Sequence, residues 1–274
     1  MLKAIRGMTK TKVPQKETHS ASQTARATLL LREMVVDGHF RPGERIREIP
    51  LAARLRVSRI PLRLALERLA HEGLLEMRPT RGFIVQQFSS GDIFDAIDLR
   101  GLLEGAAARL ASERLRDSRE LAPLREANLG MEALLNRRKM TLDAFTGYIS
   151  LNARFHAGII DLAHSRIVRR AVNQACALPF ASPSAFLLKQ QFIEHSRELF
   201  LVAVDHHRGI IDAIGSREGM RAETLMREHA RLARRHLDVA LSDRDLLRSV
   251  RGGKLIELPT RSVSGDLAVS GDLE

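Results

Sequence analysis

The stretch PGERIREIPLAARLRVSRIPLRLALERLAHEGLLEMRPTRGFIV, residues 42–85, decides the fold. The Pro42-Gly43 pair predicts a turn, and residues 49–56 and 58–73 each predict a short helix. The FIV run that follows Arg81-Gly82 predicts a β-hairpin with a glycine near its tip. Helix, turn, helix and hairpin in this order indicate a winged helix-turn-helix, which we expect over residues 23–88.

The second helix of the pair is expected to carry its arginines away from the core. A helical wheel places Leu62, Ala65, Leu66 and Leu69 on one side and Arg59, Ile60, Arg63 and Leu64 off that side. Two arginines four residues apart near a helix N-terminus can enter a major groove and bond the O6 and N7 atoms of guanine. The alternative is that Arg59 and Arg63 only solvate a helix surface.

The charge of the chain is unevenly distributed. Residues 1–90 hold 17 Lys and Arg against 8 Asp and Glu, a net +9, and the remaining net +2 follows from the total of +11. A basic first third in front of a nearly neutral body is typical of a nucleic-acid-binding protein. A solvated basic face with a basic tail is the competing interpretation.

Four segments are expected along the chain. Residues 1–22 are polar and basic and are predicted to be a disordered arm before the winged helix. The first helix after this arm is expected to start near Ser22 or Thr24, to run to Val36 and to end at Gly38. Residues 90–241 read as helical throughout, with Ser90 as the first cap and a helix expected over residues 166–180. Residues 245–274 are predicted to be a flexible tail without an assigned function. The fold class is therefore mostly α, a winged helix followed by an all-α bundle.

A known family resembles residues 42–85. The chain supplies the pattern of the GntR superfamily DNA-binding domain through Pro42, Gly43, Leu55, Val57, Ser58, Arg59, Pro61, Arg63, Ala65, Leu66, Leu69, Gly73, Leu74, Arg81 and Gly82. The resemblance implies that Arg59 and Arg63 contact bases, with Ser58, Pro61 and the wing at Arg81-Gly82 lying at the DNA.

The chain departs from that family at two positions of the same helix. Ile60 stands where members usually carry Thr, and Leu64 stands where they usually carry Glu. Both residues are expected to be exposed, and either thymine methyl groups or the wing can cover them.

The helical segment resembles the FadR-type ligand domain, called FCD, in its shorter six-helix VanR-like form. The matching positions in IDLRGLLEGAAARLASE are Leu99, Arg100, Leu103, Glu104, Ala107 and Ala111. The resemblance covers roughly residues 24–241. It implies a homodimeric transcriptional regulator that binds a palindromic operator in double-stranded DNA and responds to a small organic acid.

Many members of that domain hold a metal through one Asp and three His. The matching positions here are Asn152 and His156 in NARFH, His207 in HRGII, and His229 in a Met-x-x-His motif. The resemblance implies a divalent transition metal, with Zn or Ni favoured by the imidazole ligands. Asn152 is neutral where the family has Asp, and the alternative is a polar patch of histidines in a helical core.

Arg100 lies on the first helix of this domain, and two roles are open for it. The resemblance implies that it reaches the effector cavity and binds a carboxylate. Alternatively, it is a surface arginine paired with Glu104 one turn away.

The sequence gives less support to other classes of protein. No P-loop, GxGxxG, GxSxG or His-Glu-x-x-His motif is present, so we expect no enzyme. A helical metal-dependent hydrolase and a structural helical DNA-associated protein are the alternatives. A single cysteine, the lack of a long apolar run and the lack of a signal sequence predict a cytoplasmic protein with no membrane contact.

Overall fold

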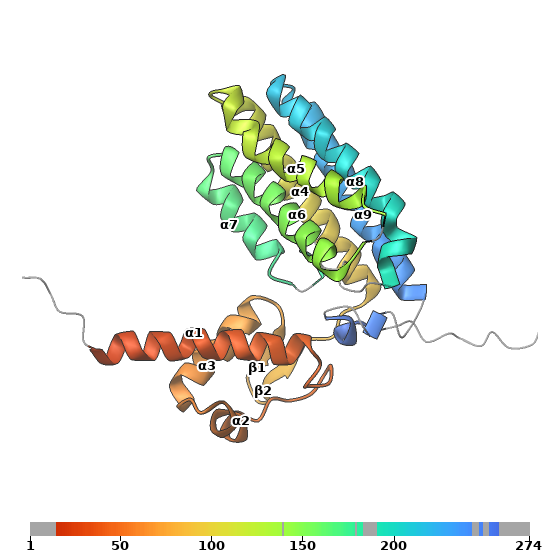
Figure 1. Ribbon diagram of the computed structural model, residues 1–274. Coiled ribbons are helices and arrows are strands. Elements are labelled where there is room, and N and C mark those ends of the chain that lie inside the picture. Colours follow the sequence, from red (N-terminus) through yellow and green to blue (C-terminus); the bar gives the residue numbers. More distant parts are fainter. Residues whose placement is uncertain are drawn as a thin grey trace, which may run out of the picture.

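The computed structural model describes residues 15–138, 140–178, 180–182, 191–242, 247–248 and 252–257. These residues form a small N-terminal lobe and a bundle of long helices beside it (Figure 1). The N-terminal lobe consists of α1 (Gln15–Val36), α2 (Glu48–Leu55), α3 (Arg59–His71), β1 (Leu75–Arg78) and β2 (Gly82–Val85). The bundle consists of α4 (Ser90–Arg114), η1 (Ser118–Leu121), α5 (Ala122–Leu135), α6 (Leu142–Leu162), α7 (Arg166–Ala175), α8 (Gln191–Gly215) and α9 (Gly219–Ser242).

The N-terminal lobe is the expected winged helix-turn-helix. The Pro61, Leu62, Ala65, Leu66 and Leu69 side chains of α3 are buried, so one face of α3 enters the core. The wing is an antiparallel pair in which Leu75 lies opposite Val85 and Arg78 opposite Gly82. The result is a rigid platform that leaves the other face of α3 uncovered.

The helix α1 braces this platform. Both Arg32 Nη2 and Arg32 Nε donate to the Glu72 carboxylate just beyond α3, with the shortest contact at 2.7 Å. Gly38 ends α1 with a φ of +74°, a left-handed conformation that glycine adopts without strain. The predicted end of this helix is therefore confirmed, but its start is not. The helix begins at Gln15, within the segment expected to be disordered, while residues 1–14 lie outside the described residues.

The bundle is organised around the close contact of α4 with α9. A Cβ atom at Gly101 would lie 2.9 Å from Ala230 Cβ, and one at Gly105 would lie 2.9 Å from Arg227 Cγ. The two glycines on one face of α4 therefore let the backbones approach more closely than larger residues would. The cap of α4 is Ser89 rather than the expected Ser90, in a reciprocal capping box with Asp92.

Two expectations for the C-terminal half require correction. The helix expected over residues 166–180 ends at Ala175, and Phe180 lies in a turn, buried edge-to-face against Phe88 with ring centroids 4.6 Å apart. The flexible tail expected from residue 245 is wrong for residues 252–257, which form a short ordered segment containing η2 (Gly253–Leu255).

This segment, residues 252–257, joins the two lobes and is called the strap below. The Phe88 N–H donates to the Leu255 carbonyl at 2.9 Å, and the Glu257 N–H donates to the Phe88 carbonyl at 2.8 Å. Lys254 Nζ donates to the Asp37 carbonyl beyond the end of α1 at 2.8 Å. Leu255 is fully buried, in the same apolar core as the winged helix. The strap therefore completes the core of the N-terminal lobe.

Replacing Leu255 with Ala tests this role of the strap. We expect the free energy of unfolding to fall by about 2–5 kcal/mol, because the change leaves a cavity in a packed core. Leu129→Ala is the matched control, since Leu129 is 63% exposed and should cost less than about 0.5 kcal/mol. Urea unfolding of both variants makes the measurement, and equal losses would show that the strap contributes nothing to the core.

Candidate DNA interface and candidate metal centre

The uncovered face of α3 carries the residues predicted to read DNA. Arg59, Ile60, Arg63 and Leu64 are all exposed, while the opposite face of the helix is buried. Arg63 forms a 3.4 Å ion pair with Glu67, one turn further along α3. Since that pair is solvent-exposed, it is weak and can be exchanged for a contact to a base.

Ser58 lies at the N-cap position of α3 as predicted. It accepts no hydrogen bond from the first turn, and it is exposed. The first amides of α3 and the Ser58 hydroxyl are therefore arranged as donors for a phosphate group. Pro61, also predicted to lie at the DNA, is buried, whereas its neighbours Arg59 and Ile60 are exposed. A direct contact of its ring with DNA would require this burial to be relieved.

The wing places Arg81 and Gly82 on the same side as the start of α3. Gly82 and Arg59 both line an open hollow of about 990 Å³ together with residues 44–50. Arg81 is exposed at the turn between β1 and β2, where its N–H donates to the Arg78 carbonyl at 3.2 Å. Of the two predicted wing residues, Gly82 thus borders the same concave surface as the predicted reading helix.

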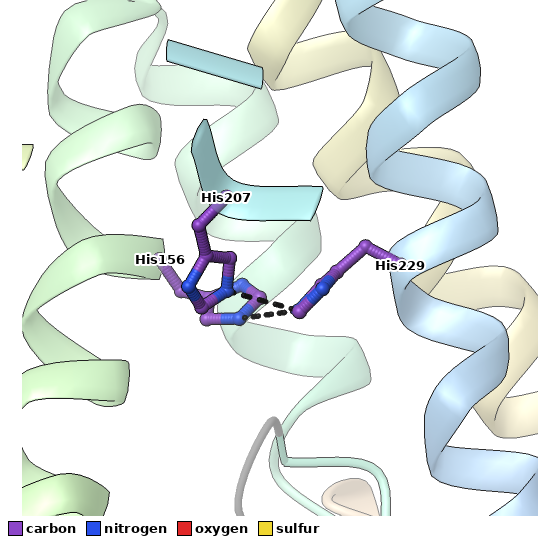
Figure 2. Close-up of side chains that lie close together, drawn as sticks. All are labelled: His156, His207 and His229. Carbon is purple, nitrogen blue, oxygen red and sulfur yellow. Dashed lines mark hydrogen bonds between the residues drawn. The ribbon is translucent and has the colours of Figure 1, made fainter. Parts of the chain in front are cut away.

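The three predicted metal-binding histidines meet inside the bundle. His156 comes from α6, His207 from α8 and His229 from α9, and Figure 2 shows their rings converging. His229 Nε2 lies 3.2 Å from His207 Nε2 and 3.3 Å from His156 Nε2. All three side chains are buried, and one ligand atom from each lies within 4.8 Å of the others. Within the described residues this is the one group of His, Cys, Asp and Glu close enough to share an ion.

Glu104 on α4 orients the first of these rings. Its Oε1 lies 3.0 Å from His156 Nδ1, and both groups are buried. Burial alone would raise the pKa of Glu104, but attraction to His156 and Arg100 and the bond from His156 hold the pKa below its ordinary value. An ionised Glu104 accepts a hydrogen bond from the Nδ1–H group of His156. The Nε2 lone pair of His156 is then directed toward His229.

The other two rings are kept neutral. Burial, reinforced by the neighbouring histidines, lowers the pKa of His207 and of His229 well below its ordinary value. Neutral imidazole is the form that binds metals. One proton on His229 Nε2 cannot serve contacts to both neighbours well, whereas a cation between the three Nε2 atoms would satisfy all of them. The donor set therefore fits a divalent transition metal.

Arg100 is not the surface residue that one interpretation required. It is 2% exposed, and its Nε lies 3.5 Å from Glu104 Oε2. Arg100 Nη2 donates to the carbonyl of Ala230, the residue after His229, at 3.5 Å, so the guanidinium lies near the histidine cluster. Its Nε and Nη1 atoms make no hydrogen bond to any residue that the structure describes. A buried guanidinium with unused donors is a ready partner for a carboxylate.

Asn152 is buried on α6, one helical turn before His156, as the i and i+4 spacing predicts. The sequence did not predict the role of Glu104. It was noticed as a family match and as a neighbour of Arg100, but its contact with His156 spans 52 residues and had no local signal.

Comparisons with known proteins find matches for both halves of the chain. The family described as bacterial regulatory proteins, gntR family, matches residues 23–85, and the FCD domain family matches residues 95–232. The Nta operon transcriptional regulator of Aminobacter aminovorans is 38% identical over 51% of this chain, and the matched part spans 63% of that relative. The uncharacterized HTH-type transcriptional regulator YdhC of Bacillus subtilis is 30% identical over 74% of this chain and 75% of its own length.

A solved structure supports the fold. The Escherichia coli protein McbR/YncC superposes with a TM-score of 0.53, at 18% identity, over 80% of this chain and 97% of its own. Within the described part of the chain, no helix is long and apolar enough to span a membrane.

A second buried histidine environment gives a pH prediction. Burial lowers the pKa of His236 to about 4, against an ordinary value of 6.5, although a bond to the Leu232 carbonyl acts in the opposite direction. Since the unfolded chain binds this proton more tightly, stability is full above pH 6.5 and falls as the pH drops toward 4. Between about pH 7.5 and about pH 5, His236 should contribute a loss of about 2 kcal/mol.

His236→Leu removes this titration while filling a similar volume. Urea unfolding at the two pH values should therefore show a smaller acid loss for His236→Leu than for the wild type. The shared contribution of His207 and His229 cancels in that comparison. An unchanged acid loss would mean that His236 titrates normally in the folded chain.

Proposed function

This chain belongs to the GntR family of bacterial regulatory proteins, with an FCD domain behind its winged helix, and we propose that a small carboxylate in that domain controls its binding to an operator. It is a DNA-binding transcriptional regulator of the GntR/FCD type. The observation that carries the proposal is the presence, in the same chain, of an uncovered, arginine-bearing α3 and a buried cluster of three histidines beside Arg100.

Operator reading is assigned to α3 and the wing. Arg59 and Arg63 lie one helical turn apart on the exposed face and carry the forked donors that bind guanine. The Ser58 hydroxyl and the Arg81 side chain are available for phosphates on either side. In this proposal Arg59 and Arg63 recognise bases, whereas Ser58 and Arg81 position the protein on the DNA backbone.

We propose that the regulator works as a homodimer in the cytoplasm, where its DNA target lies. One winged helix contacts few base pairs, and a two-fold pair of them matches a palindromic operator. In a bacterial dimer of this kind, the half-sites lie about one turn of the double helix apart. The spacing between the two α3 helices is therefore the quantity that an effector has to change.

Metal binding is assigned to the Nε2 atoms of His156, His207 and His229, with Asn152 as a weak or water-bridged fourth ligand. Zn or Ni suits three imidazoles in a bundle interior. When bound, such an ion supplies a +2 charge that attracts an anion. Glu104 contributes by holding the proton of His156 on Nδ1, which keeps the Nε2 atom of that ring free to bind.

The effector is assigned to the chemical class of small carboxylic acids. Arg100 offers unused guanidinium donors beside the histidine cluster. The helix that carries Arg100, α4, starts at Ser90 next to the winged helix, and its first turns share the apolar core of that lobe through Ile93 and Ile97. A ligand that prefers one position of α4 thereby changes the population of the DNA-competent state.

Alanine substitutions on α3 test the DNA half of the proposal. Arg59→Ala or Arg63→Ala should weaken binding to a selected operator by about 1–3 kcal/mol and relax base preference at one position per half-site. Arg125→Ala, an exposed arginine on α5, is the matched control and should leave affinity and preference unchanged. Fluorescence anisotropy measures affinity, and light scattering should find two chains per duplex.

A loss of affinity by Arg63→Ala that is equal for operator and random DNA would contradict a base contact. A monomer on the duplex would contradict the two-fold arrangement.

Changes to the histidine cluster test the metal half. His207→Ala should lose the metal but keep operator affinity, because the winged helix is a separate lobe. Asn152→Asp should tighten the metal and weaken anion binding, since it restores a negative charge. Mass-spectrometric metal analysis of protein purified without a histidine tag is the measurement. His236→Ala, which removes a buried histidine outside the cluster, is the matched control. Equal metal content in His207→Ala and His236→Ala would leave the cluster as a polar patch only.

A further inference from the structure

The exposed face of α3, which carries the predicted DNA-reading arginines, also carries two apolar side chains. Solvent-exposed positions on a helix usually hold polar residues. Ile60 is 72% exposed and Leu64 is 47% exposed. They lie four residues apart, so they form one stripe of the helix, next to the stripe formed by Arg59 and Arg63. The sequence left two possibilities for what covers these side chains, namely thymine methyl groups or the wing. The wing is excluded for Ile60, because a side chain packed on β1 and β2 would not keep this exposure.

The charge around the stripe indicates what covers it. Arg45 and Arg47 are exposed on the segment before α2, and with Arg59 and Arg63 they line the same hollow as Ile60. These four arginines outnumber the two carboxylates of the hollow, Glu44 and Glu48, so its net charge is positive. A partner protein with an apolar surface gains nothing from four arginines. Double-stranded DNA is a polyanion, and the edges of its bases carry apolar groups. It therefore matches both the arginines and the apolar stripe.

In the major groove of DNA, the apolar feature of a base pair is the C5-methyl group of thymine. We infer that Ile60 and Leu64 recognise thymine methyl groups, so that the operator of this regulator carries thymine beside the guanines read by Arg59 and Arg63. This inference rests on the proposed function of α3 and names what that surface selects. A polar side chain at either position would not distinguish thymine by its methyl group.

The test uses the full-length protein and DNA that differs by one methyl group. Duplexes that the wild type selects from a randomised pool are resynthesised with deoxyuridine in place of one thymidine at a time. Deoxyuridine keeps every hydrogen-bonding group of thymidine and lacks only the C5-methyl. Affinity should fall about fourfold at one or two thymine positions per half-site, the ratio expected for burial of one methyl-sized group.

Ile60→Ser and Leu64→Asn should each bind the thymidine and deoxyuridine duplexes equally at the position that the replaced residue reads. Leu129→Asn, which changes an exposed leucine of the bundle, should discriminate as the wild type does. Wild-type affinities that are the same for thymidine and deoxyuridine at every position would overturn the inference while leaving operator binding intact. A selection that enriches no sequence would overturn the proposed function itself, and the inference with it.

Discussion

The interior of the helical lobe depends on one buried negative charge, the carboxylate of Glu104. It lies between the Arg100 guanidinium and His156 Nδ1, and each of these groups is buried. Burying a charge without a partner is strongly unfavourable, so the three groups are stable only together. Because Arg100 and Glu104 belong to α4 and His156 to α6, the requirement also fixes the register between these two helices. The close contact at Gly101 and Gly105 then brings α9, and with it His229, to the same point.

The two lobes are separate in function but not in packing. The first turns of α4 contribute Ile93 and Ile97 to the apolar core of the winged helix, and α9 contributes Leu237. The same two helices carry Arg100 and His229 further along. A movement of α4 against α9 at the histidine cluster must therefore be accommodated where both helices meet the winged helix. Rigid helices with buried contacts at each end transmit such a displacement over their full length.

What the sequence predicted correctly was encoded locally. Gly38 and Gly73 end their helices with positive φ values, and the apolar face of α3 follows from a 3.6-residue period. The histidines were found because the family resemblance named their motifs, and the structure brings the three together. Two contacts could not be predicted in this way, namely the bond from His156 to Glu104 and the packing of the strap. Both join residues that are far apart in the chain, so neither a helical period nor a capping residue indicates them. Pro61 was placed at the DNA because the motif contains it, although its ring serves the core.

The strap has a consequence for the order in which this protein is made. Phe88 pairs with Ile256, a separation of 168 residues (256 − 88), and the core that they close belongs to the first lobe to be synthesised. When residues 23–88 of the winged helix have been translated, the strap residues that complete its apolar core have therefore not yet been translated. Contacts this distant in sequence form late and leave apolar surface open in the meantime. The apolar core of the winged helix is therefore complete only after residues 252–257 have been translated.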